Sequence, residues 1–219
     1  MIAGRDEVVR IRLAVLVSGR GSNLQAIMDA IGAGRLDASV EVVISDMPDA
    51  PALERARARG IPAVAVRRRD YSSRAEFETA LADAAERARP DLIVLAGFMR
   101  LLGPAFLDRF PGRVINIHPS LLPAFPGLEA QRQALEYGVK FTGCTVHYVD
   151  YGMDSGTIID QRVVAVMPGD DVDILSARIL EQEHDLLGEA MSKAAGERPE
   201  RPRAKQSAKG DARCGQEQA

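Results

Sequence analysis

The regular alternation of short apolar runs with amphipathic segments constrains the fold of this chain more than any other feature. The apolar runs have the length and continuity of parallel strands covered on both faces, and they lie at residues 12–17, 40–44, 63–66 and 92–96. Segments with helical spacing separate them, at residues 24–31, 51–59 and 73–89. This β-α-β-α order with short connections predicts an α/β, Rossmann-like fold, in which helices cover both faces of a twisted, mostly parallel sheet.

The second half of the chain brings the predicted sheet to about seven strands. Strand patterns lie at residues 114–118, 143–149 and 157–166, and helical patterns at 131–137 and 170–191. After Met191 the chain contains no Val, Ile, Leu, Met or aromatic residue. Such a segment cannot bury enough apolar surface to offset its loss of conformational entropy. We therefore expect one domain over residues 1–195 and a polar, disordered tail over residues 196–219.

Charge and cysteine content exclude several classes of protein. The 219 residues include 28 Lys and Arg against 31 Asp and Glu, a net charge of −3, so no basic field favours nucleic acid or an anionic membrane. No apolar run approaches membrane-spanning length, and the first residues lack the pattern of a signal peptide. Cys144 and Cys214 are far apart, no Cys/His cluster has metal spacing, and we expect a cytoplasmic protein without a disulfide framework or a metal.

A glycine-containing turn follows the first predicted strand. Residues 18–23 (SGRGSN) precede a helical pattern, and backbone amides at a helix N-terminus favour anions such as phosphate. A dinucleotide site would have a third glycine in place of Asn23 and an acidic residue about 20 positions later, whereas Asp46 comes somewhat late. The alternative is a tight turn in which Asn23 or Ser22 caps the helix.

Asn116 and His118 lie two residues apart at the end of a predicted strand. Side chains at this spacing project from the same face, where an amide and an imidazole can stabilise an anionic oxygen and transfer a proton. Both this pair and the glycine turn follow the carboxyl ends of strands, where ligands bind in such sheets. The alternative for His118 is a structural histidine with satisfied hydrogen bonds.

Three further places carry polar side chains with two possible roles. Arg100 stands in the apolar stretch 97–102 (GFMRLL), either at the first turn of a helix or as the polar group of a slot for a flat heterocycle. Asp150 and Asp154 flank a loop, where they either make local turns or set one carboxylate against His118. Glu183 lies on the apolar stripe of the last helix, and it either faces water at the rim or contacts a ligand.

Taken in order, the motifs of the chain resemble those of glycinamide ribonucleotide formyltransferases, the folate-dependent enzymes of purine synthesis. The motifs span residues 13–184 and comprise SGRGSNLQAI, LERAR, LAGFMRLLGPAF, NIHPSLLPAFPG, TVHYV, the aspartate of MDSG, and QEH. The resemblance implies the formyltransferase fold and transfer of the formyl group of 10-formyltetrahydrofolate to the amine of phosphoribosylglycinamide. It also implies a monomer or homodimer with these small molecules, rather than a nucleic acid or a membrane, as partners.

The resemblance assigns roles to individual residues. The residues that match the catalytic trio are Asn116, His118 and Asp154. Those that match contacts to phosphoribosylglycinamide are Gly21, Ser22, Asn23 and Glu183. Those that match the folate site are Arg74, Met99, Arg100, Leu101, Leu102, Asn116, Val149, Asp150, Met153 and Asp154. The Leu122–Pro123 bond falls where the family has a cis peptide.

The chain also departs from the family pattern. Glu129 stands where relatives often have His or Asn, Leu180 replaces a polar residue that contacts the nucleotide in some members, and Ser-Gly-Thr follows Asp154 in place of Gly-Gly-Pro. The apolar strand region that follows the last helix in the family has no counterpart here. Two related enzymes share the catalytic trio: methionyl-tRNA formyltransferase, which has a basic tRNA-binding domain, and formyltetrahydrofolate deformylase. A nucleotide-binding Rossmann module without catalytic activity is the alternative from another class.

Overall fold

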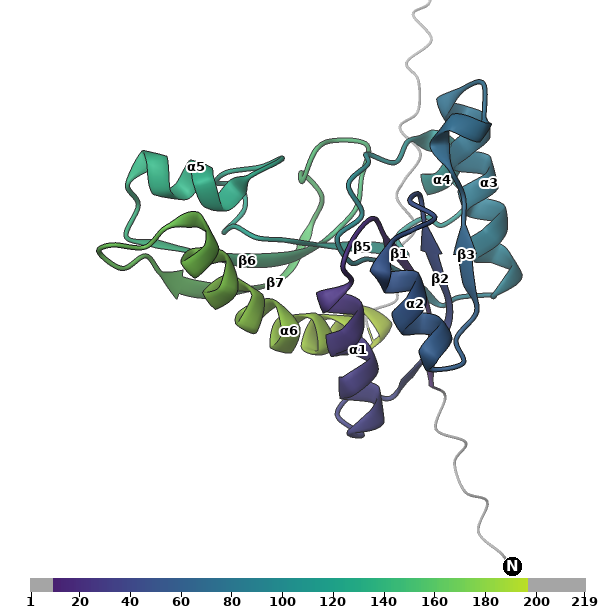
Figure 1. Cartoon of the computed structure of the whole chain (residues 1–219), viewed down its shortest axis with the longest axis horizontal. Helices are drawn as coiled ribbons and strands as arrows, with labels where there is room; N and C mark the ends of the chain where they lie inside the picture. Colours follow the sequence, from purple (N-terminus) through teal and green to yellow (C-terminus); the bar gives the residue numbers. More distant parts are fainter. Residues whose placement is uncertain (1–9, 197–219) are drawn as a thin grey trace, which may run out of the picture.

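The computed structural model describes residues 10–196 as one seven-stranded sheet with the strand order β3-β2-β1-β4-β5-β6-β7 (Figure 1). The strands are β1 (Ile11–Val17), β2 (Ala38–Ser45), β3 (Ala63–Ala65), β4 (Leu92–Leu95), β5 (Val114–His118), β6 (Phe141–Tyr148) and β7 (Ile158–Ala165). Strands β1 to β5 are parallel, whereas β6 is antiparallel to both β5 and β7. The predicted α/β fold, with a mostly parallel sheet of seven strands, is therefore confirmed.

Helices cover both faces of the sheet. They are α1 (Ser22–Gly32), α2 (Pro51–Ala58), α3 (Arg74–Arg87), α4 (Pro104–Leu107), α5 (Ala130–Tyr137) and α6 (Val172–Gly196), with a 3-10 turn, η1 (Arg68–Asp70). The buried side chains of α1, α2 and α6 pack with Leu13, Val15 and Val17 of β1. Those of α3 and α4 pack with Ala14 and Leu16, because successive strand residues point to opposite faces.

The same alternation decides where the polar residues of β5 point. Ile115 and Ile117 join the core on the α6 side, whereas Val114 joins the core under α3 and α4. Asn116 and His118 therefore project from the α3 face, where β4 and β5 end. Figure 1 shows that the β6–β7 hairpin and α5 extend this end of the molecule away from the β1–β4 half.

Several local expectations need correction. The stretch 97–102 forms no helical turn and instead leads as irregular chain into α4, which, like η1, was not predicted. Helix α6 runs five residues beyond Met191. Cys144 is buried and has a free thiol. Of the tail predicted over residues 196–219, Gly196 belongs to α6, and the rest, with Cys214, lies outside the described residues. Within residues 10–196, no helix combines the length and apolar character needed to cross a membrane.

Candidate active site

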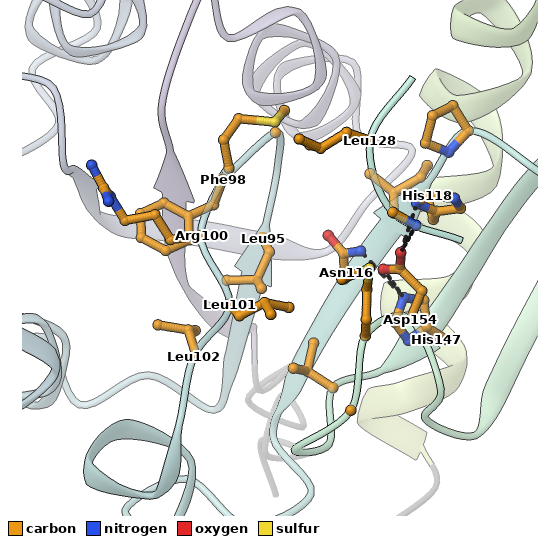
Figure 2. A pocket seen from close by; sticks show the side chains of 18 of the residues that line it. Leu95, Phe98, Arg100, Leu101, Leu102, Asn116, His118, Leu128, His147 and Asp154 are labelled. Carbon is orange, nitrogen blue, oxygen red and sulfur yellow. Dashed lines mark hydrogen bonds and ion pairs between the residues drawn. The ribbon is translucent and has the colours of Figure 1, made fainter. Parts of the chain in front are cut away.

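Four polar side chains from three elements converge at the end of β5 (Figure 2). Asn116 and His118 come from β5, His147 is the cross-strand neighbour of Asn116 on β6, and Asp154 comes from the loop between β6 and β7. Figure 2 shows Asp154 against both imidazoles. The expectation that one loop aspartate is set against His118 is therefore confirmed, because Asp154 Oδ2 lies 3.3 Å from His118 Nδ1.

His118 is buried with a hydrogen-bond acceptor at each ring nitrogen. Its Nδ1 faces the Asp154 carboxylate, and its Nε2 lies 2.9 Å from the carbonyl oxygen of Phe125. A neutral imidazole carries only one N–H, so it can satisfy only one of these acceptors. Only a ring protonated at both nitrogens would donate to both acceptors, and such a ring can also donate to an anionic oxygen or give up a proton.

Asp154 is held as a carboxylate by the groups around it. Burial alone would raise its pKa, but contact with His147, the Gly127 N–H and the charge of His118 together lower the pKa below its usual 3.8. The Gly127 N–H donates to Oδ2 at 2.8 Å, and His147 Nε2 lies 3.7 Å from Oδ1. Asp154 adopts a left-handed backbone with φ of 49°, which turns the loop tip toward the imidazoles.

His147 was missed as a site residue in the sequence, where it was only one of three histidines. Its Nδ1 lies 2.9 Å from the Tyr148 carbonyl oxygen, and its Nε2 faces both the Asp154 carboxylate and the Asn116 amide. The Asn116 Nδ2 donor lies 3.2 Å from that Nε2. His147 thereby fixes the orientation of the Asn116 amide. The motif TVHYV marks His147 only as a strand residue, and its place beside Asn116 follows from the pairing of β6 with β5.

An apolar cleft of about 480 Å³ opens beside these four side chains. It is lined by residues that include Gly97–Leu102, Asn116–Pro119, Gly127–Glu129, His147, Val149, Asp150 and Gly152–Asp154. All the residues assigned to the folate site therefore reach the cleft except Arg74. The Arg74 guanidinium instead pairs with Glu78 at 2.5 Å and donates to the Leu101 carbonyl oxygen at 3.1 Å, behind the cleft wall.

The glycine turn lies at the N-terminus of α1, outside the cleft lining. Gly21 has φ of 74° and occupies the N-cap position, where a Cβ would come within 2.7 Å of Ala52 Cβ, so only glycine fits. The expectation that Ser22 or Asn23 caps the helix is wrong, because both residues already belong to α1. The Asn23 amide instead donates to Glu183 Oε2 at 2.9 Å.

Glu183 is buried against α1 and does not face water at the rim as its alternative interpretation expected. Burial raises the pKa of its carboxyl group above the usual 4.5, and the hydrogen bond from Asn23 opposes this only in part. Asn23 Oδ1 is buried without a hydrogen-bond partner among the described residues. A buried carboxyl group beside an unsatisfied amide oxygen marks a place where a polar ligand could complete the hydrogen bonds.

The remaining local expectation concerns the loop that follows β5. The Leu122–Pro123 peptide bond is cis, as the resemblance implied. The Leu122 N–H donates to Thr145 Oγ1, whose hydroxyl in turn donates to the Ser120 carbonyl oxygen, so β6 holds this loop under the site.

The sequence model of the formyl transferase family matches residues 11–191, nearly the whole described chain. The chain belongs to the formyl transferase family. Phosphoribosylglycinamide formyltransferase of Bacillus subtilis is 44% identical over 79% of this chain and 89% of that protein. The Escherichia coli enzyme of the same name is 45% identical over 78% of this chain and 81% of its own length.

A longer relative and a relative of known crystal structure agree with this family assignment. The trifunctional purine biosynthetic protein adenosine-3 of Drosophila melanogaster is 50% identical over 80% of this chain, which spans only 13% of that protein. The crystal structure of glycinamide ribonucleotide transformylase 1 from Symbiobacterium toebii is 50% identical and superposes with a TM-score of 0.85, covering 89% of this chain and 93% of that one. This formyl transferase therefore shares sequence with both relatives and the fold of the Symbiobacterium toebii structure.

Proposed function

We propose that this formyl transferase moves the formyl group of 10-formyltetrahydrofolate to the amine of phosphoribosylglycinamide, a step of purine biosynthesis. The observation that carries the proposal is the contact between His118 and Asp154 at the edge of an apolar cleft. The names of the relatives point to the same substrate. The chain acts in the cytoplasm as a monomer or homodimer, on small molecules rather than on nucleic acid or at a membrane.

The cleft fits a flat heterocycle such as the pteridine of the formyl donor. Its walls include the exposed apolar side chains of Met99, Leu101 and Met153, while the irregular backbone of residues 100–102 offers N–H and C=O groups along one side. A mostly apolar slot with a few polar groups is the usual form of a site for such a ligand. Val149, Asp150 and Asp154 then close the donor site from the opposite loop.

The second substrate would lie between the cleft and α1. Its phosphate is bound by the backbone amides of Gly21, Ser22 and Asn23, where the dipole of an eleven-residue helix favours negative charge. Glu183 and Asn23 supply the polar contacts to the sugar or glycinamide part, which would satisfy the free Asn23 oxygen. The substrate amine then reaches the donor near His118.

The chemistry follows from the groups at the end of β5. The amine attacks the formyl carbon directly, and a tetrahedral intermediate forms with negative charge on its oxygen. Asn116 donates a hydrogen bond to that oxygen, and the cationic His118 adds a charged one once its Nε2–H leaves the Phe125 carbonyl. Preorganised donors of this kind contribute about 3–4 kcal/mol each to transition-state stabilisation.

Asp154 completes the proton transfers. It stabilises the imidazolium form of His118 and accepts the proton of the attacking amine, directly or through a water molecule. His118 or water then protonates the departing folate nitrogen. The reaction needs neither a covalent bond between substrate and enzyme nor a metal ion in this proposal.

One assay separates the proposed function from its rivals. The protein is mixed with 10-formyltetrahydrofolate alone, with phosphoribosylglycinamide or with methionyl-tRNA, and formylated product, formate and binding of the ribonucleotide are measured. Formyl transfer only when the ribonucleotide is present supports the proposal. Release of formate without the ribonucleotide favours a deformylase, formylation of methionyl-tRNA favours the tRNA enzyme, and nucleotide binding without reaction favours a non-catalytic module.

A further inference from the structure

One wall of the cleft is an irregular segment, residues 97–103, which joins β4 to α4 and is called here the 97–103 wall. Phe98 and Leu102 are buried, whereas Met99 and Leu101 remain exposed at the cleft. A segment without helix or strand cannot satisfy its backbone groups by regular pairing. Side chains from elsewhere in the fold must therefore fix its shape.

The first attachment comes from Asp46, at the end of β2. This carboxylate is only 5% exposed; its Oδ1 accepts from Ser18 Oγ at 2.7 Å, and its Oδ2 accepts from Arg100 Nε at 2.5 Å. The Ser18 hydroxyl oxygen in turn accepts from the Met99 N–H at 2.9 Å, and the Ser18 N–H donates to the Gly97 carbonyl oxygen. Asp46 thus holds the first half of the wall in two ways: directly through the Arg100 side chain, and by way of Ser18 through the Met99 N–H.

The second attachment comes from Glu78 on α3, which is 2% exposed. Its Oε1 accepts from the Gly103 N–H at 2.9 Å and from Arg74 Nε at 2.5 Å, while Arg74 Nη2 donates to the Leu101 carbonyl oxygen. A Cβ at Gly103 would lie 3.0 Å from Glu78 Oε2 and 3.1 Å from Arg74 Nη2. Glycine at position 103 therefore allows the carboxylate and the guanidinium to approach the backbone closely.

The two attachments have the same design. In each, one arginine neutralises the charge of a buried carboxylate. The carboxylate also holds a backbone N–H of the wall, directly for Glu78 and through the Ser18 hydroxyl for Asp46. A buried carboxylate is tolerated only when it is paired and hydrogen-bonded, so each carboxylate and its wall contacts depend on one another. Neither Asp46 nor Glu78 lines the cleft, which separates their role from direct ligand contact.

We propose that Asp46 and Glu78 are positioning residues that hold the 97–103 wall in the shape that binds the formyl donor. The inference rests on the proposed function, and it extends that function by giving Arg74 and Arg100 a second task as the charge partners of these carboxylates. Because the wall belongs to the donor site alone, its loss of shape affects donor binding and leaves ribonucleotide binding and the chemical step intact.

The test uses the full chain with Asp46→Asn and Glu78→Gln, which keep side-chain size and remove the charge. Each variant is expected to raise the KM for 10-formyltetrahydrofolate roughly tenfold, since misplacement by about 1 Å can cost up to about a hundredfold. The kcat at saturating donor and the KM for phosphoribosylglycinamide should stay within about twofold of wild type. Hydrogen exchange measured by NMR should become faster at the Met99 and Gly103 amides.

Two further variants make the result unambiguous. Asp83→Asn removes an exposed partner of Arg109 on the same helix as Glu78, away from the cleft, and should change neither the donor KM nor amide exchange in the wall. Ser18→Ala removes the link between Asp46 and the Met99 N–H without altering a buried charge, and it replaces Asp46→Asn if that variant does not fold.

The outcomes separate this inference from the proposed function. A donor KM within twofold of wild type in both variants overturns the inference, and so does a fall in kcat with the donor KM unchanged. If the wild-type protein transfers no formyl group, the proposed function fails. In that case amide exchange and the Kd for 10-formyltetrahydrofolate from calorimetry still decide whether the two carboxylates shape a binding wall.

Discussion

Asp154 is the residue on which both imidazoles of the site converge. Its carboxylate faces His118 and His147, and its pKa lies below the usual value, so it is ionised throughout the neutral range. Asp154→Asn keeps the shape of the side chain but cannot accept a proton or stabilise a cationic imidazole. We expect this variant to lose most of its turnover while its affinity for the folate donor stays near that of the wild type.

Steady-state kinetics and donor binding by calorimetry check this expectation. A purified Asp154→Asn protein with near-normal turnover across the pH range would remove Asp154 from the mechanism. Ser155→Ala is a suitable comparison, because it removes the hydrogen bond from the Ser155 hydroxyl to Asp150 within the same loop, and Ser155 does not line the cleft. Loss of turnover in both variants would mean that loop shape, rather than the Asp154 carboxylate, is responsible.

His147 acts through Asn116, one contact further from the substrate than Asp154. His147→Phe keeps a planar ring and removes the ring nitrogen that contacts the Asn116 amide. Because loss of one oxyanion donor costs about 100- to 1000-fold in kcat, and misorientation costs less, we expect kcat to fall about 10- to 100-fold. The KM for the donor should change little. His184→Gln, on α6, should leave kcat unchanged; an equal loss in both variants would contradict a specific role for His147.

Glu183 lies buried between α1 and α6, where ionisation of its carboxyl group lowers the stability of the fold. The pKa of Glu183 is raised by burial, so the folded protein holds this proton more tightly than the unfolded chain does. The stability that the Glu183 proton contributes is therefore fully present below pH 4.5, and it is lost as the pH rises through the folded-state pKa of this group. Glu183→Gln removes this penalty. At pH 7.5 we expect its Tm to be higher than that of the wild type, by about 2–4 °C for each kcal/mol of penalty removed, while the KM for phosphoribosylglycinamide increases.

Thermal melting from pH 4 to pH 8 checks the sign of this effect. The difference between Glu183→Gln and wild type should shrink as pH falls and vanish near pH 4. Glu181→Gln changes an exposed carboxylate two residues earlier on α6 and should show neither the gain in Tm nor the change in KM. A Glu183→Gln protein that is less stable than wild type at pH 7.5 would show that the ionised carboxylate stabilises the contact with Asn23.

The elements differ in how far the sequence alone predicts them. The central strands and α1 to α3 were predicted within about two residues, because continuous apolar runs and helical spacing report burial directly. Helix α4 was missed because its four residues span barely one turn, too few for a periodic pattern. Helix α6 extends beyond its predicted end because Ala194 still packs against the core, and alanine gives a weak apolar signal.

The site shows the same division between local and long-range information. Asn116 and His118 were found because two residues on one strand share a face. His147 and the attachments of Asp46 and Glu78 depend on which strands and loops are neighbours, and no local pattern contains that information. The family motifs pointed to Arg74 as a ligand contact, whereas only the fold shows that its guanidinium is already paired with Glu78 behind the wall.

At the scale of the whole molecule, α6 ties the far end of the chain to the sheet. Met191 and Ala194 are buried in its last turns, and Lys193 forms an ion pair with Asp160 of β7. The sequence after residue 196 has no Val, Ile, Leu, Met or aromatic side chain to add to this core. We therefore expect a chain cut after Gly196 to melt at the same temperature as the full chain.

A second cut, after Glu189, tests the reason for this expectation. It removes Ala190, Met191 and Ala194, and burial of one methionine contributes about 1.5–3 kcal/mol. At about 2–4 °C per kcal/mol for a chain of this size, the Tm should fall by at least about 3 °C. Scanning calorimetry of the three chains distinguishes the cases. A lower Tm for the chain cut after Gly196 would mean that residues 197–219 stabilise the fold, and that the domain boundary expected at residue 195 is wrong.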